Sequence, residues 1–191
     1  SNPRFAYIAP TFKQAKSIAW DYMKQFTAKI PHTKFNETEL RVDLPNGSRI
    51  TLLGSESPDG LRGIYLDGCV IDEYANVNSK LFPEIIRPAL SDRKGYCVFI
   101  GTPMGMNNNF YELYQHAQGA EDWFNYKAKA SDTKIVDNDE LVKAKEVMGD
   151  KKFQQEFECD WIANIEGAVY GDVIAKLDDD KQLTRVPYDP A

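Results

Sequence analysis

The sequence is poor in the residues on which several kinds of active site depend. Its 191 residues include two histidines, His32 and His116, and three widely spaced cysteines, Cys69, Cys97 and Cys159, with no Cys-x-x-Cys pair. Two histidines leave little for Ser-His-Asp or Cys-His catalysis, and without a Cys/His cluster no zinc site is expected. An odd number of scattered cysteines predicts buried free thiols in a reducing compartment.

Basic charge and long apolar runs are also scarce. The net charge is −6, which argues against a constitutive, high-affinity nucleic-acid binder but is compatible with a local basic patch. No apolar run is long enough to span a bilayer and no signal-peptide pattern is present, so we expect no membrane association. The chain begins Ser1-Asn2 without Met and enters a strand pattern at once, which indicates a piece cut from a longer protein.

The patterns that are present alternate between strand and helix, which is typical of an α/β fold with a mostly parallel sheet. The turn at Asn46-Gly47 predicts a hairpin between two of the strands. Strands are predicted at 5–10, 40–44, 49–54, 69–71 and 96–100, of which the first and the last are expected to be buried, and an edge strand is predicted at 124–128. Helices are predicted at 12–26, 82–90, 110–117, 139–148 and 153–161.

The first predicted helix has a capping residue, an apolar stripe and several lysines. Thr11 is its expected N-cap. The apolar stripe predicts the face that packs on the sheet and consists of Ala15, Ile18, Ala19, Tyr22, Met23 and Phe26. The lysines could face DNA phosphates, but they spread around the helix, so a solvated face is the better interpretation; they are Lys13, Lys16, Lys24 and Lys29.

Two adjacent carboxylates, Asp72 and Glu73, follow the apolar run at 69–71. In an open α/β sheet, ligands bind beyond the carboxyl ends of the strands. The first carboxylate in such a position is suited to hold Mg²⁺, directly or through water, and the second to orient an attacking water molecule. The alternative is a pair of solvated carboxylates at a strand end, because short motifs often match by chance.

Two further groups support a phosphate site. Arg62 lies in a loop between Gly60 and Gly63, where a mobile guanidinium is suited to a phosphoryl-transfer transition state. Gly101 and Thr102 follow the next predicted strand, where a small hydroxyl could sense the γ-phosphate or the attacking water. The alternatives are a surface arginine in a turn and an ordinary strand-to-loop turn.

Taken together, the order of these motifs resembles the large terminase subunit of tailed bacteriophages, the motor that pumps DNA into a procapsid. The arginine loop, the Asp72-Glu73 strand, the Gly101-Thr102 strand and the segment 110–114 follow one another as they do in that family. The segments 7–16 and 153–157, with Trp161, are also similar, so that the resemblance covers residues 3–170.

The resemblance implies a RecA-like P-loop NTPase (ASCE) core with ATP and Mg²⁺ as cofactors. Asp72 would be the Walker B carboxylate that supports Mg²⁺, and Glu73 the catalytic glutamate that activates water. Arg62 matches the position of an arginine finger. Thr102, with Gly101, would belong to the motif that couples hydrolysis to DNA movement.

The family also needs a phosphate loop ending in Gly-Lys-Ser/Thr, and the sequence contains no Gly-Lys dipeptide. We therefore expect residues 1–165 to be a partial ATPase domain that lacks the phosphate-loop strand. Residues 166–191 would be a linker leading toward a missing nuclease domain, because 187–190 resemble the family's stretch before that domain. Asp178, Asp179 and Asp180 do not match its metal-binding position.

The resemblance also implies a role for the intact protein of which this chain would be a part. The intact protein would hydrolyse ATP to translocate double-stranded DNA and cleave that DNA with a separate nuclease domain. Its partners would be DNA, the portal protein, the small terminase subunit and further copies in a ring, in the host cytoplasm and transiently on the phage procapsid, with a phage or prophage origin.

The chain alone is expected to have no useful ATPase activity, since phosphate-loop contacts supply most of the hold on a nucleotide. One alternative is a non-catalytic interaction domain with a degenerate ATPase fold. Another is a helicase-like ATPase fragment, although Tyr74-Ala75 and the Gly101-Thr102 turn fit the packaging family better.

Overall fold

The computed structural model describes residues 2–162 of the chain. The chain divides into two compact units, Ser1–Lys127 and Ala128–Ala191, and the described part of each unit is treated by itself. The proposed boundary at residues 165 and 166 and the proposed linker lie outside the described residues. None of the helices in the described part of the chain is long and apolar enough to cross a membrane.

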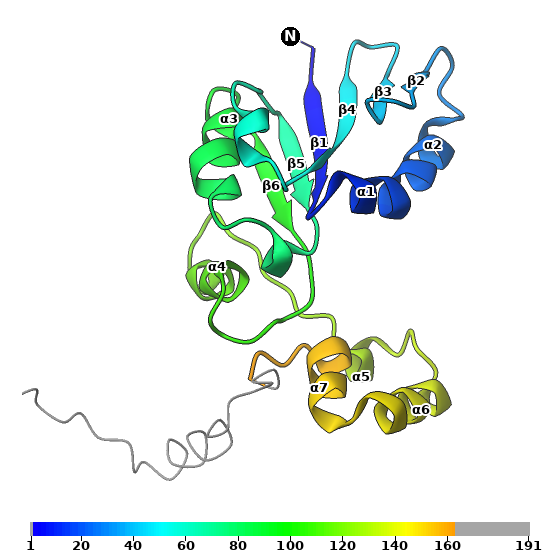
Figure 1. The fold of residues 1–191 in the computed structure, drawn as a ribbon, viewed down its shortest axis with the longest axis vertical. Coiled ribbons are helices and arrows are strands. Elements are labelled where there is room, and N and C mark those ends of the chain that lie inside the picture. The colour runs from blue at the N-terminus through cyan, green and yellow to red at the C-terminus, as the bar shows by residue number, and fades with distance from the viewer. Residues whose placement is uncertain (1, 163–191) are drawn as a thin grey trace, which may run out of the picture. The chain divides into compact units, whose positions relative to one another are not determined.

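The first unit contains a six-stranded mixed sheet with the strand order β2-β3-β4-β1-β5-β6 (Figure 1). The four strands β4, β1, β5 and β6 are parallel neighbours, and β2 and β3 add an antiparallel edge. The strands are β1 (Arg4–Ala9), β2 (Lys34–Asn36), β3 (Arg41–Asp43), β4 (Arg49–Gly54), β5 (Gly68–Ile71) and β6 (Tyr96–Phe99). The predicted mostly parallel α/β sheet and the predicted hairpin are both confirmed.

Helical segments connect these strands. A long helical stretch follows β1 and comprises α1 (Phe12–Ala15), the π-helix η1 (Lys16–Trp20) and α2 (Asp21–Thr27). Short 3₁₀ turns are η2 (Pro58–Leu61) and η3 (Tyr74–Asn76), and the π-helix η4 (Leu81–Ile86) continues into α3 (Arg87–Ser91). Helix α4 (Asn109–Ala117) is capped by Asn108, whose side chain accepts from the N–H groups of Phe110 and Tyr111.

The two faces of the sheet carry separate apolar clusters, because side chains alternate along each strand. On β1, Ile8 belongs to the cluster beneath η4 and α3, whereas Tyr7 packs against the cluster beneath α1 and η1. The first cluster contains Ile71 and Ile86, and the second contains Trp20, all of them almost fully buried. Helix α1 packs on β1 and β4. The second cluster therefore covers only the part of its sheet face that lies on the β1 and β4 side of the sheet.

The predicted stripe on the first helix is partly wrong. Thr11 caps the helix as expected, but Tyr22 and Phe26 are 62% and 75% exposed, and Trp20, outside the stripe, is 2% exposed. The π-helical turn η1 explains this difference. One extra residue in a turn shifts the angular position of every following side chain, so a strict 3.6-residue pattern fails beyond it.

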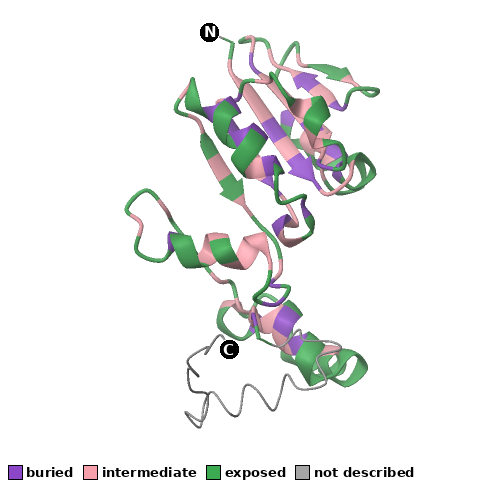
Figure 2. Ribbon diagram, turned by 60° about the vertical axis from the view of Figure 1, so that its left-hand side comes forward, coloured by how far each residue is buried: buried purple, intermediate pink, exposed green. Residues whose placement is uncertain are grey.

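Strand β6 is present where it was predicted, but it is not buried on both faces. Cys97 and Phe99 pack against the first cluster, whereas Tyr96, Val98 and Ile100 remain 59%, 42% and 43% exposed. Figure 2 shows this strand in the colours of exposed and intermediate residues. Among the described residues β6 pairs only with β5, so the other edge of β6 is open.

The second unit is helical in its described part. It contains α5 (Ala130–Thr133), α6 (Asn138–Met148) and α7 (Asp150–Glu158), with Phe153 buried. Asp137 caps α6 by accepting from the N–H group of Asp139. The helices predicted here are confirmed, with α7 ending at Glu158. The edge strand predicted at 124–128 is wrong, since these residues form no strand.

Candidate active site at the carboxyl ends of the parallel strands

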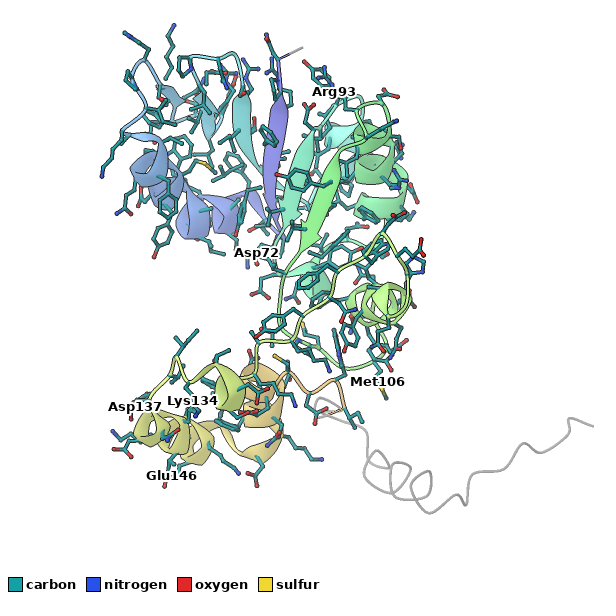
Figure 3. The ribbon with its side chains drawn as sticks, turned by 180° about the vertical axis from the view of Figure 1, so that it is seen from behind. Asp72, Arg93, Met106, Lys134, Asp137 and Glu146 are labelled. Atoms are coloured by element: carbon teal, nitrogen blue, oxygen red, sulfur yellow. The ribbon has the colours of Figure 1, made fainter. Side chains whose placement is uncertain are left out.

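Asp72 lies directly beyond the end of β5, at the carboxyl edge of the sheet (Figure 3). Its N–H group donates to the carbonyl oxygen of Ile8 at 2.8 Å, which extends the pairing with β1 by one residue. Both of its carboxylate oxygens accept hydrogen bonds. Oδ1 accepts from the N–H group of Glu73 at 2.8 Å, and Oδ2 accepts from the hydroxyl of Tyr7. The carboxylate is therefore held in one orientation.

The surroundings of the Tyr7 hydroxyl favour its protonated form. Partial burial raises the pKa of Tyr7 well above its ordinary value, and the hydrogen bond to Asp72 and the charges of Asp72 and Glu73 raise it further. A phenol with a raised pKa remains a donor at neutral pH. Tyr7 thus acts on Asp72 as a hydrogen-bond donor and does not compete with it for a cation.

Glu73 has a left-handed backbone conformation, with φ of 48° and ψ of 45°. Such a conformation is uncommon for residues other than glycine and costs free energy, of order 1 kcal/mol, so neighbouring contacts must hold it. The N–H group of Tyr74 donates to the carbonyl oxygen of Ile100 at 3.1 Å, which ties this turn to the end of β6. Tyr74 itself is buried against Phe99 and Phe110, and burial raises its pKa to about 12.

Gly101 brings the end of β6 against the Asp72-Glu73 turn. A Cβ atom at Gly101 would lie 3.2 Å from the backbone nitrogen of Tyr74 and 3.3 Å from the Cα atom of Glu73. Its φ of +154° also favours glycine. Thr102 follows at once and is half-buried. Four of the five predicted site residues, Asp72, Glu73, Gly101 and Thr102, therefore come from the same ends of two neighbouring strands.

Arg62 is the fifth predicted site residue and lies elsewhere. Its side chain is 56% exposed at the end of η2, where the guanidinium contacts Asp59 at 2.8 Å and Glu84 of η4 at 3.5 Å. The hydrogen bond to Asp59, followed by the charges of Asp59 and Glu84, raises the pKa of Arg62 further. Its contacts within the chain are thus with two surface carboxylates.

The sequence patterns missed several residues that shape this edge of the sheet. Tyr7 is the first, because its contact with Asp72 depends on β1 and β5 being neighbours. Ser55 is 2% exposed and donates through Oγ to the carbonyl oxygen of Pro10 at 3.0 Å. Glu56 accepts from the N–H group of Phe12 at 2.8 Å, close to Gly54, where a Cβ atom would collide with both groups. These contacts fix the start of α1 beside the end of β4.

The carboxylate oxygens at this site suit a magnesium ion that is already bound to the phosphates of a nucleotide. Among residues 2–162, no three His, Cys, Asp or Glu side chains lie close enough together to hold a metal ion. Mg²⁺ usually keeps several waters and binds one or two carboxylates plus substrate phosphates. Each oxygen of Asp72 uses one lone pair in the contacts above and retains another. The residues present therefore fit a phosphate-held Mg²⁺ and do not form a self-sufficient metal site.

Comparisons with known proteins agree on one family. The family model described as terminase large subunit, T4likevirus-type, N-terminal, matches residues 1–172. The terminase large subunits of Thermus phage G20c and Thermus virus P23-45 are each 30% identical over 126 residues. That match covers 56% of this chain and 26% of each relative, so the chain spans only part of the length of these relatives.

Solved structures share the fold. The large terminase ATPase domain of Thermus phage P74-26 has a TM-score of 0.69 at 23% identity, over 84% of this chain and 77% of that one. A large terminase from a thermophilic bacteriophage has the same TM-score at 14% identity, over 84% of this chain and 41% of that one. At such identities the likeness shows the fold, which is the RecA-like α/β fold of an ATPase domain. The chain belongs to the terminase large subunit family, in its T4likevirus-type N-terminal part.

Proposed function

We propose that this chain is part of the ATPase engine of a phage DNA-packaging motor, in which Glu73 activates water and Asp72 supports Mg²⁺. The observation that carries the proposal is the contact between the Asp72-Glu73 turn and the Gly101-Thr102 turn at the carboxyl ends of adjacent parallel strands. Ligands of open α/β sheets bind at such ends. The large terminase of the thermophilic bacteriophage, which shares the fold, has been solved with ADP and with ATP-gamma-S.

Each residue has a chemical task in this proposal. Mg²⁺, when bound with the nucleotide, neutralises charge on the phosphates. Asp72 receives the ion or its water with a carboxylate that is already oriented, so little reorganisation is needed. Glu73 lies one residue further along and orients the attacking water. Thr102 senses the γ-phosphate from the neighbouring turn. Arg62 is largely exposed, which suits an arginine finger that reaches a neighbouring subunit.

The open edge of β6 is the proposed place for the missing phosphate-loop strand. Parallel sheets are normally covered on both faces, yet Tyr96, Val98 and Ile100 of this region are exposed. By the alternation of the strands, Asp72 lies on the same sheet face as Val98 and Ile100. The matched P74-26 ATPase domain also extends beyond the part that this chain covers. A strand beside β6 would carry the phosphate loop to the edge where Asp72 lies.

The wider role follows from family membership and is also a proposal. The intact protein translocates double-stranded DNA into a procapsid, as a ring of copies that works with the portal protein and the small terminase subunit. It acts in the host cytoplasm and transiently on the procapsid. In the proposed layout, residues 1–165 belong to the ATPase domain, and 166–191 lead toward a nuclease domain that cuts the packaged DNA.

The proposal is tested by phosphate release from the longer protein that contains this chain and a phosphate loop. Glu73→Gln is expected to lower the hydrolysis rate by about 10²-fold or more, because it removes the general base, and to leave ATP-gamma-S binding unchanged. Glu121→Gln, an exposed carboxylate of the same type, is the matched control and should hydrolyse ATP at the wild-type rate. The isolated 191-residue chain is expected to show no turnover.

Two results would contradict the proposal. If Glu73→Gln hydrolyses ATP as fast as the wild type, Glu73 does not activate water. If the longer wild-type protein neither binds nor hydrolyses ATP, the domain is a degenerate ATPase fold with an interaction role.

A further inference from the structure

The contact between Tyr7 and Asp72 links two strands at the candidate site. Register places Tyr7 opposite Val70, and Asp72 follows two residues later on the same face of the sheet. A phenol side chain is long enough to reach this diagonal neighbour, and its hydroxyl donates to Asp72 Oδ2. Packing of Tyr7 against the second apolar cluster would be served equally well by phenylalanine. The hydroxyl therefore has a use that packing does not explain.

A simple alternative is that a partly buried phenol needs some acceptor. What distinguishes this acceptor is its second hydrogen bond. The oxygen of Asp72 that does not contact Tyr7 accepts from the N–H group of Glu73, whose backbone is left-handed. The terminal torsion of an aspartate is soft, so one hydrogen bond alone leaves the carboxylate free to rotate. Two hydrogen bonds, one to each oxygen, fix its plane.

We propose that Tyr7 is a positioning residue for the Asp72-Glu73 pair. Its hydroxyl fixes the carboxylate of Asp72, and that carboxylate holds the N–H group, and hence the left-handed turn, of Glu73. In this role Tyr7 acts through Asp72 and needs no contact of its own with nucleotide or metal. This inference rests on the proposed function for its consequence in catalysis, but the Tyr7-Asp72-Glu73 chain of contacts is testable without any nucleotide.

The first experiment uses the 191-residue chain and the amide signal of Glu73 in ¹⁵N NMR spectra. Tyr7→Phe keeps the ring and removes the hydroxyl. It is expected to shift the Glu73 amide and to speed its hydrogen exchange roughly fivefold to tenfold, as a weakened hydrogen bond does. Tyr22→Phe, which removes an exposed hydroxyl from α2, is the matched control and should leave this amide unchanged.

A double variant separates positioning from general destabilisation. Asparagine at position 72 keeps one oxygen for the Glu73 amide but loses the second acceptor that Tyr7 uses. If Tyr7 acts through Asp72, the pair Tyr7→Phe/Asp72→Asn gives the same Glu73 exchange rate as Asp72→Asn alone. The inference would be overturned if the two substitutions had additive effects on the exchange rate of the Glu73 amide, or if that amide did not respond to Tyr7→Phe. Should Tyr7→Phe fail to fold, the Glu73 amide in Asp72→Asn still tests the Asp72 link, and an unchanged amide there overturns it.

The second experiment measures metal affinity in the longer protein by electron paramagnetic resonance of Mn²⁺ with ATP-gamma-S. Loss of an outer hydrogen bond to a metal ligand typically weakens binding 10-fold to 100-fold, so about tenfold weaker Mn²⁺ binding is expected for Tyr7→Phe and no change for Tyr22→Phe. Unchanged Mn²⁺ affinity in Tyr7→Phe would reject its role toward the metal. A wild-type protein that binds no Mn²⁺-nucleotide would instead reject the proposed function and leave the NMR result standing.

Discussion

Glu73 and Gly101 meet at the candidate site with backbone angles that most residues avoid, φ of 48° and +154°. The two conformations are complementary. Glu73 turns the chain sharply away from β5, and Gly101 leaves the space into which that turn fits. The hydrogen bonds of Asp72 to the N–H group of Glu73 and to the Tyr7 hydroxyl also hold the turn. The site therefore depends on the absence of a Cβ atom at Gly101 as well as on the carboxylates.

Gly101→Ala is therefore expected to destabilise the chain by roughly 1–3 kcal/mol, because a Cβ atom would press on the Glu73 and Tyr74 backbone and φ would be strained. Urea unfolding followed by circular dichroism measures this change. Gly60→Ala is the matched control, since a Cβ atom there would meet nothing within 4 Å. Equal stability of Gly101→Ala and the wild type would show that the turn relaxes freely.

Among the elements, β6 has the least complete environment of the parallel strands. One edge pairs with β5, and the side chains of Tyr96 and Val98 are exposed on one face. An open edge with exposed apolar side chains invites pairing with another strand. In the isolated chain that partner can be a second copy. In the longer protein the proposed partner is the phosphate-loop strand and the segment that follows it.

Val98→Lys distinguishes these two environments. In the 191-residue chain it is expected to reduce self-association in sedimentation experiments and to change the free energy of unfolding by no more than about 0.5 kcal/mol, as surface substitutions do. In the longer protein it is expected to destabilise by roughly 2 kcal/mol or more, because an unpaired charge would become buried. Val147→Lys on α6, at a valine that is 89% exposed, should be neutral in both. A neutral Val98→Lys in the longer protein would contradict the proposed covering of β6.

At the scale of the whole molecule, the described residues form two compact units joined near Lys127 and Ala128. The preceding residues 124–127 are in neither helix nor strand, and Phe124 and Tyr126 are 88% and 72% exposed. The sheet and both apolar clusters lie wholly within the first unit. This arrangement predicts that the first unit keeps its fold when the chain is cut at the junction.

Within residues 2–162, limited chymotrypsin digestion is expected to cleave first at Phe124 or Tyr126, because exposed backbone outside regular structure is the preferred site of nicking. Mass spectrometry identifies the cut, and circular dichroism should show a folded N-terminal product. Phe124→Ala/Tyr126→Ala should slow this cleavage, whereas Phe26→Ala, which alters an exposed aromatic within a helix, should not. First cleavage inside the sheet, or unfolding of the product, would contradict the two-unit organisation.

Local features of the sequence predicted much of this molecule. Thr11 caps its helix, the Asn46-Gly47 turn joins β3 and β4, and Asp72 follows an apolar strand. These features depend on side chains a few residues apart, so the order of residues is sufficient to show them. The sequence by itself thus determined the class of fold and the two carboxylates at a strand end.

The tertiary structure decided which groups meet. The Tyr7-Asp72 hydrogen bond and the contact of Gly101 with Glu73 require a particular strand order, which no local pattern encodes. The exposure of Tyr22 followed from a π-helical turn, and the exposure of Val98 from a sheet face that the second apolar cluster does not cover at β6. Apart from the π-helical turn, which is local, these outcomes depend on packing between segments distant in the chain, and burial is a property of neighbours rather than of residue type.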